Sequence, residues 1–241
     1  MICQTNKAPL YAAFFCAVLT SCTATKQTPE AGLVQCADST LPIAAVQGSG
    51  SQSPMQGQQV TVKGIVTLIR EGDGLYLEDP DSDALAPTSN ALFIQSEDLP
   101  GAIEPGTLIA ARGTVTEIGD ERDPLTALTG GTEAVLCSTV HTLPLTEVSL
   151  PLDAAGRESI EGMRIRISAP LVATDVYQFD RGKFTLSASG FQYVPTEIMQ
   201  PGESAARQSD LNRANTLRVL LPESMRVPAL LVSGDSTDQI T

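Results

Sequence analysis

Three aspartates at alternate positions, Asp79, Asp81 and Asp83, are the first residues with the chemistry for a site, in the stretch GLYLEDPDSDALAPTSNALFIQS. Carboxylate oxygens are the ligands that calcium and magnesium prefer. The stretch lacks the central glycine and the downstream bidentate glutamate of an EF-hand, so that motif is excluded. We expect a solvated connection between two strands, with a calcium or magnesium site on these aspartates as the alternative. No other cofactor is expected.

Catalytic chemistry has little support in the chain. There is one histidine, His141, so a paired-histidine metal site or a serine nucleophile with a separate base lacks its partners. We find no Gly-x-Ser-x-Gly elbow, phosphate-binding glycine loop or zinc-ligand spacing. The chain as given is therefore expected to be catalytically silent, with His141 as a packing or surface residue of a strand.

The N-terminus carries export signals. Residues 1–21 hold one charge, Lys7, and an apolar run from Ala8 to Thr20 that is too short to span a bilayer, as in a secretory signal. The sequence Leu19-Thr20-Ser21-Cys22 resembles the bacterial lipobox, whose cysteine is acylated. We expect lipid on Cys22, a tether over residues 22–40, and a protein held on the bacterial outer membrane or cell surface. The alternative is an ordinary signal peptide with an incidental cysteine.

Removal of the leader and acylation of Cys22 leave two of the five cysteines, Cys36 and Cys137. In an oxidising exported compartment an isolated pair is most simply a disulfide. Two buried free thiols are the alternative. A bridge would fasten the lead-in segment to the end of the first module.

The composition disfavours simple nucleic-acid binding. The formal net charge is −13, with no Trp, four Tyr and six Phe. Most of the excess acid lies before Leu145, so the first half of the chain repels phosphate unless cations intervene, whereas the second half is nearly neutral. Few aromatic rings are present on which bases could stack.

The elements that would position these residues are strands. Long alternating runs cover Gly57–Ile69 and Glu104–Ile118, broken by Gly64 and Gly113 as a bulge or bend would break them. GLYLED and ALFIQS predict a hairpin with a long connection, and Ala134–Leu143 a fifth strand. Five strands without a long helical period predict an OB-like five-stranded barrel over residues 41–145, with a sandwich as the alternative.

A second, smaller strand-rich module is expected over residues 146–228. It opens with Met163, Ile165 and Ile167 on one face of a strand, and it includes one short surface helix, Glu203–Asn215. Residues 229–241 begin a further strand pair and form an incomplete C-terminal segment. The expected fold class is all-β.

Consecutive motifs between Leu41 and Glu223 resemble the N-terminal region of large secreted bacterial nucleases. The motifs are LPIAAVQGSGSQSP, VTVKGIVT, the acidic hairpin, PGTLIAARGTVTEI, SIEGMRIRIS and FTLSASGFQYVPT. In that family an OB-like module precedes a catalytic domain of the endonuclease/exonuclease/phosphatase type, which makes the parent a metal-dependent extracellular deoxyribonuclease. The resemblance implies an accessory, non-enzymatic region whose partners are extracellular DNA and a nuclease domain outside this chain.

Nucleic-acid contacts, if present, are expected on the second and third barrel strands and on a basic patch in the second module. The candidate residues are Tyr76, Phe93, Arg164, Arg166, Arg181 and Lys183. The favoured hypothesis is a lipid-anchored accessory region that binds nucleic acid or a partner domain. The alternative is an envelope lipoprotein for protein interaction or cation-dependent adhesion, unrelated to nucleic acid.

Overall fold

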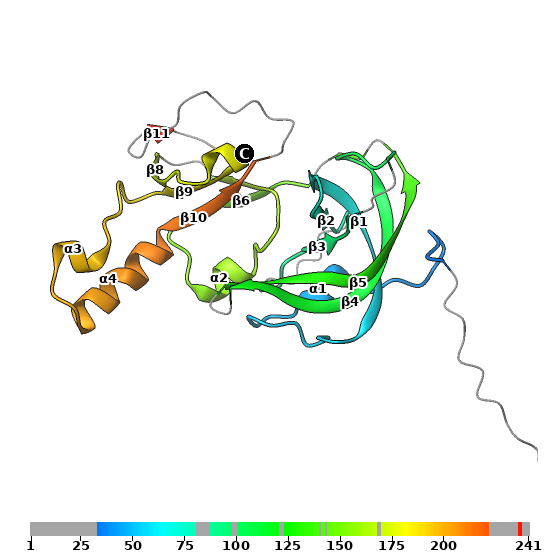
Figure 1. The fold of residues 1–241 in the computed structure, drawn as a ribbon, viewed down its shortest axis with the longest axis horizontal. Helices are drawn as coiled ribbons and strands as arrows, with labels where there is room; N and C mark the ends of the chain where they lie inside the picture. The colour runs from blue at the N-terminus through cyan, green and yellow to red at the C-terminus, as the bar shows by residue number, and fades with distance from the viewer. Residues whose placement is uncertain are drawn as a thin grey trace, which may run out of the picture. The chain divides into compact units, whose positions relative to one another are not determined.

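Strands dominate the computed structural model (Figure 1), which describes residues 33–80, 87–97, 101–120, 123–139, 141–142, 144–167, 170–221 and 236–237. The fold is all-β, as predicted. A five-stranded barrel is followed by a smaller strand-rich region. The first part contains α1 (Ile43–Gln47), β1 (Gln59–Arg70), β2 (Gly74–Glu78), β3 (Ala91–Gln95), β4 (Leu108–Asp120) and β5 (Asp123–Ser138).

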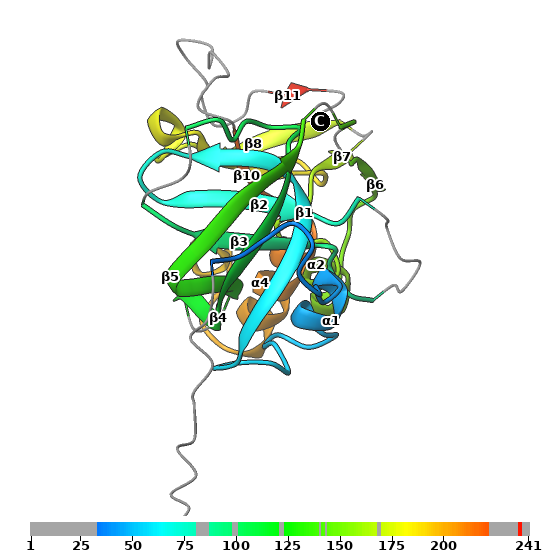
Figure 2. The same cartoon turned by 90° about the vertical axis from the view of Figure 1, so that its right-hand side faces the viewer.

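The barrel closes in the order β1-β2-β3-β5-β4, and β4 returns to β1. All neighbours are antiparallel except β3 and β5, which meet in parallel through two residue pairs, Phe93 with Ala127 and Ile94 with Leu128. Figure 2 shows the long strands β1, β4 and β5 running steeply across β2 and β3. The hairpin of β2 and β3 confirms the pairing expected on either side of the acidic loop.

Glycines in the long strands sit where backbones approach closely. A Cβ on Gly113 would lie 2.9 Å from Leu128 Cβ, and the β4–β5 register shifts between Arg112 and Thr114, around this glycine. A Cβ on Gly64 would lie 3.0 Å from Leu77 Cβ. At both positions a side chain would crowd the adjacent, hydrogen-bonded strand, β5 for Gly113 and β2 for Gly64, which explains the breaks seen in the sequence pattern.

Two elements of the barrel differ from the prediction. β5 begins at Asp123, well before the expected Ala134, and its first half pairs with β4. The polar and small residues of the stretch TALTGGTEA give no clear strand pattern, so this part of β5 was not predicted. The short helix α1, at the start of the expected barrel module, was not predicted, and its residues Ile43 and Val46 are fully buried in the barrel core.

The second region is built on its own hydrophobic cluster, although residues 33–241 form one compact unit. A four-stranded sheet has the order β10-β9-β8-β11, and β6 and β7 form a parallel pair. The predicted helix is present as α4, with α2, η1 and α3 as additional short helical turns. The bounds are β6 Thr146–Val148, α2 Ala154–Glu158, β7 Ile165–Ile167, β8 Leu171–Asp175, η1 Phe179–Arg181, β9 Lys183–Ser187, α3 Pro195–Ile198, α4 Glu203–Ala214, β10 Thr216–Leu220 and β11 Ser236–Thr237.

Candidate functional site

The face predicted to bind bases consists of the outward side chains of β2 and β3. Leu75 and Leu77 fill the barrel core, so Tyr76 between them points outward. Its cross-strand partner is Phe93, and the two ring centroids lie 4.9 Å apart at an interplanar angle of 50°. This tilted pair is the main aromatic feature of the face.

The face is covered by residues 161–164, which we call the strap. Gly162 has φ +68°, and a Cβ there would lie 3.1 Å from Tyr76 Cδ1 and 3.5 Å from Ala91 Cβ. Phe93 is 4% exposed. Burial also raises the pKa of Tyr76. In this arrangement Gly162 lies against the Tyr76 ring, and the prediction that Tyr76 and Phe93 stack bases stays a prediction.

Polar contacts hold the strap at both of its ends. Ser89 Oγ donates to Glu161 O at 2.6 Å, and Arg164 N donates to Glu78 Oε2 at 3.0 Å. Glu78 is 1% exposed. Its burial raises the pKa to about 7, against the lowering effect of the hydrogen bond from Arg164 and of the Arg164 charge.

Glu161, which lies in the strap itself, is the second carboxylate at this contact. Its Oε1 accepts from Thr126 N at 3.0 Å and from Gln47 Nε2 at 3.5 Å. The pKa of Glu161 is raised to about 7, mainly by burial and also by the nearby charges of Glu158 and Glu117, against the lowering effect of the two donors. A strap residue thus ties α1 and β5 to the second region.

The basic candidates belong to two different sheets. Arg164 Nη1 donates to Pro144 O at 3.4 Å, and Arg166 forms a 3.1 Å ion pair with Glu147 across β6 and β7. Arg181 and Lys183 flank Gly182 at the start of β9, in a different sheet. Arg181 is exposed and Lys183 half-buried. The basic candidates thus form two pairs on different sheets, and the Arg166 charge is partly neutralised by Glu147.

The acidic loop is described only in part. Asp79 Oδ2 accepts from Ile43 N at 3.2 Å, which connects the end of β2 to α1. Asp81 and Asp83 lie outside the described residues. Within the described ranges no three His, Cys, Asp or Glu side chains are grouped so as to hold a metal ion. The described residues therefore provide no set of ligands for the calcium or magnesium site that was considered as the alternative.

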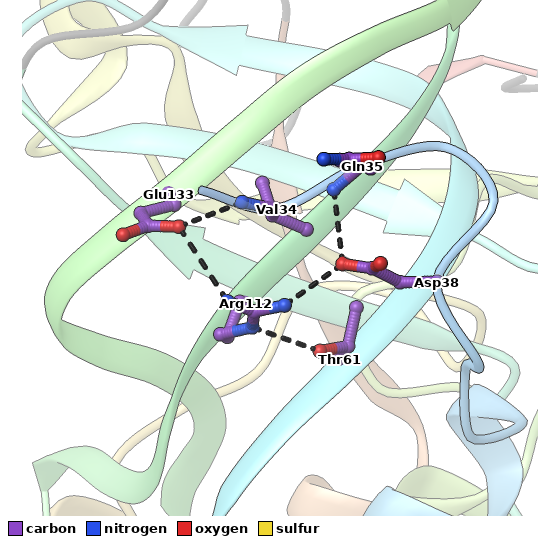
Figure 3. Close-up of polar contacts among 6 residues, drawn as sticks. All are labelled: Val34, Gln35, Asp38, Thr61, Arg112 and Glu133. Atoms are coloured by element: carbon purple, nitrogen blue, oxygen red, sulfur yellow. Dashed lines mark hydrogen bonds and ion pairs between the residues drawn. The ribbon is translucent and has the colours of Figure 1, made fainter. Parts of the chain in front are cut away.

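The lead-in segment is fastened to the barrel, as the cysteine pattern predicts. Cys36 and Cys137 form a disulfide that closes a separation of 101 residues. Figure 3 shows the neighbouring polar cluster around Arg112, whose guanidinium lies 2.8 Å from Asp38 and 3.8 Å from Glu133. Glu133 also accepts from Val34 N at 2.9 Å. Cys22, the expected lipidation site, lies outside the described residues.

Sequence reasoning missed an exposed apolar group in the second region. Phe191 and Tyr193 contact each other edge-on with centroids 5.0 Å apart, and they are 42% and 56% exposed. Asn212 of α4 donates to Tyr193 O at 2.9 Å, so α4 supports this segment. The α3–α4 patch is defined by Phe191, Tyr193, Val194, Ile198 and Leu211. The sequence offered a signal for this patch, because two aromatic residues lie close together in a chain that has few of them.

His141 makes polar contacts with two neighbouring residues of the fold. Its Nε2 lies 2.6 Å from Ser138 Oγ and its backbone N donates to Gly106 O at 2.8 Å.

The strap residues gave no sequence signal, because a Glu-Gly pair in a polar turn is typical of any loop.

No protein-family model matches the chain, and no curated protein matches it either. In the part that the structure describes, no helix is long and apolar enough to cross a membrane.

Proposed function

We propose that this chain is a non-catalytic, exported accessory region that binds a protein partner or partner domain, of the kind that precedes the catalytic domain in the secreted nucleases it resembles. The observation that carries the proposal is the covered β2–β3 face, where Phe93 is 4% exposed. In an OB-like barrel whose usual ligand face is covered by its own chain, that face is closed to a ligand, so we infer that the barrel positions a neighbouring domain or protein.

Charge supports a protein partner over nucleic acid. The chain has a formal net charge of −13. The α3–α4 patch presents apolar side chains, and the only charged residue in the stretch FQYVPTEI is an acid, Glu197. Phosphate backbones are held by clustered Lys and Arg, whereas apolar side chains exposed together are typical of protein contacts. An apolar protein surface is the occupant that this patch fits.

Lipidation is part of the proposal and rests on the lipobox alone. A multiply acylated Cys22 would gain about 0.8 kcal/mol for each buried CH2 and would hold the chain on a membrane. The disulfide and the polar cluster around Arg112 would then connect the lipid-anchored tether to the barrel. Loss of fatty-acid label in Cys22→Ala supports this, and label that persists in the variant contradicts it.

The first experiment is DNA binding measured by fluorescence anisotropy, with labelled single- and double-stranded oligonucleotides in about 50 mM salt and calcium, since phosphate contacts are strongest at low salt. We expect no saturable binding. Affinity that falls steeply with salt, and that is lost in Arg181→Ala with Lys183→Ala, would overturn the protein-partner proposal in favour of nucleic acid.

The partner contact is tested by photo-crosslinking in the native cells. A photoreactive residue replaces Tyr193 in the patch, and the matched control replaces Tyr177, which is 89% exposed outside it. We expect one defined protein or polypeptide segment to be captured at position 193 and not at 177. Equal capture at both positions, or none at 193, would contradict the patch as the contact.

A further inference from the structure

We propose that the α3–α4 patch binds the same patch of a second copy of this chain, in a dimer whose two α4 helices run antiparallel across a two-fold axis. The inference rests on the proposed function, in which this patch contacts a protein, and it names that protein. A two-fold axis brings the same surface of both copies together, so such an interface must be complementary to itself. The charges of α4 meet that requirement.

The outward face of α4 carries three charged side chains. Ala205 is 7% exposed and marks the inward face of the helix. Glu203, Arg207 and Asp210 are all exposed, and their spacing of four and then three residues puts them together on the opposite face. We call these three residues the α4 stripe.

The order of the charges along the stripe is complementary to itself. α4 spans Glu203–Ala214, and Arg207 and Asp210 lie at equal distances on either side of its midpoint. Two antiparallel α4 helices aligned at their midpoints therefore place Arg207 of each copy opposite Asp210 of the other, twice in the dimer. A parallel pair would place like charges opposite each other. At the ends of the helix pair, Glu203 of one copy lies close to Arg213 of the other, again an acid with a base.

The ion pair that Arg207 makes within one copy is easily exchanged. Arg207 Nη1 lies 3.4 Å from Glu203 Oε2, between side chains that are 66% and 93% exposed. Ion pairs this exposed contribute little to stability. Arg207 can therefore turn to Asp210 of a second copy at little cost, and a contact that the apolar patch shields from water is stronger than the pair it replaces.

Apolar side chains adjoin the stripe. Leu211 follows Asp210 and lies about 100° further round the helix, and it is 58% exposed. α3 lies beside α4 (Figure 1), and its residue Ile198 and the preceding Val194 are 56% and 57% exposed. The two-fold axis keeps each side of the stripe on the same side in both copies, so the two Leu211 side chains lie on one side of the helix pair. Apolar side chains exposed together in this way are typical of protein interfaces.

A second copy fits the stripe better than a partner of one charge sign. A basic surface would meet Arg207 and an acidic one would meet Asp210, whereas an antiparallel second copy presents the opposite charge to both. The formal net charge of −13 opposes the approach of two copies. That repulsion acts over long distances and is screened at about 150 mM salt, where the Debye length is about 8 Å, while charges in a partly buried contact are screened less.

Sedimentation velocity at about 150 mM salt tests the dimer. The sample is disulfide-intact protein without residues 1–22, which keeps the compact unit of residues 33–241. We expect the mass to rise with concentration toward that of two copies. Arg207→Glu alone, or Asp210→Arg alone, puts like charges opposite each other at both contacts. Each should raise the dimer dissociation constant by about tenfold or more, since two exposed pairs change from attraction to repulsion.

The matched control is Arg181→Glu, which makes the same change of charge on the exposed end of η1, outside the patch. It should leave the dissociation constant close to that of the unsubstituted protein.

Mixing the two α4 variants separates the interface from any loss of folding. In a dimer of Arg207→Glu with Asp210→Arg, one contact joins the two substituted positions and the other joins the two native residues, so both contacts are an acid with a base. We expect the equimolar mixture to dimerise about as tightly as the unsubstituted protein.

The mass of one copy at every concentration would overturn the dimer. Single variants that dimerise as tightly as the unsubstituted protein, or a mixture no tighter than either variant alone, would overturn it as well. A monomer whose position 193 captures a different protein in cells contradicts the dimer alone. Saturable DNA binding that is lost in Arg181→Ala with Lys183→Ala contradicts the proposed function instead.

Discussion

Replacing Gly162 by alanine measures how tightly the strap lies on the barrel. Gly162 has φ +68°, and a Cβ would lie 3.1 Å from Tyr76 Cδ1 and 3.2 Å from Tyr76 Cε1. The substitution therefore brings two separate costs. One is the left-handed backbone, and the other is the contact with the ring.

Gly190 provides the matched control. It has φ +83° and nothing within 4 Å of the Cβ position. Gly190→Ala should lower the free energy of unfolding by about 1 to 2 kcal/mol through the backbone alone. Gly162→Ala should cost the same amount plus about 1 to 3 kcal/mol for overpacking against Tyr76.

The assay is equilibrium urea unfolding of the disulfide-intact protein, followed by far-UV circular dichroism, for both single variants. A Tyr76→Ala background completes a double-mutant cycle, in which the excess cost of Gly162→Ala should disappear because its contact partner is gone. Equal costs for Gly162→Ala and Gly190→Ala, or an excess that persists without the Tyr76 ring, would refute the packing of the strap on this face.

Four further outcomes are expected. Replacing Cys36 and Cys137 by serine should lower the free energy of unfolding in urea by up to about 4.7 kcal/mol in the chain-entropy model for a loop of about 100 residues. Arg112→Ala should cost about 1 to 3 kcal/mol in the same assay, because two carboxylates lose their common cation. Gly113→Val should destabilise by about 1 to 3 kcal/mol, since the new Cβ meets a β5 side-chain carbon at 2.9 Å. Burial raises the pKa of Glu78 from 4.5 to about 7, so the stabilising contribution of the protonated carboxyl is full below about pH 4.5 and is lost as the pH rises through about 7. Glu78→Gln should therefore raise the free energy of unfolding near pH 8 by up to about 3 kcal/mol, because the amide stays neutral. The change should be seen as a higher melting temperature.

The barrel was predictable because its strands carry local signals. Alternating apolar residues and the breaks at Gly64 and Gly113 mark the long strands, and the isolated pair Cys36 and Cys137 indicates the disulfide. The first half of β5 was not predictable in the same way, since its stretch TALTGGTEA is polar and small. Its strand state comes from pairing with β4, which is a tertiary effect.

The candidate site was less predictable than the fold. Alternation correctly sets Tyr76 and Phe93 apart from the core leucines, but it cannot show that a distant segment covers them. Glu161 lies 85 residues beyond Tyr76 in sequence number, and its environment is made by α1, β4, β5 and α2 together. A buried carboxylate of this kind becomes visible only when the elements are assembled.

The most direct test of the covered face is a proton nuclear Overhauser measurement between Gly162 and the Tyr76 ring. With a Cβ position 3.1 Å from the ring, the Gly162 α-protons should give strong cross-peaks to the Tyr76 ring protons. Such peaks would establish the strap on the β2–β3 face. Their absence, together with ring resonances of Tyr76 and Phe93 that respond to a soluble paramagnetic probe as exposed groups do, would contradict the account.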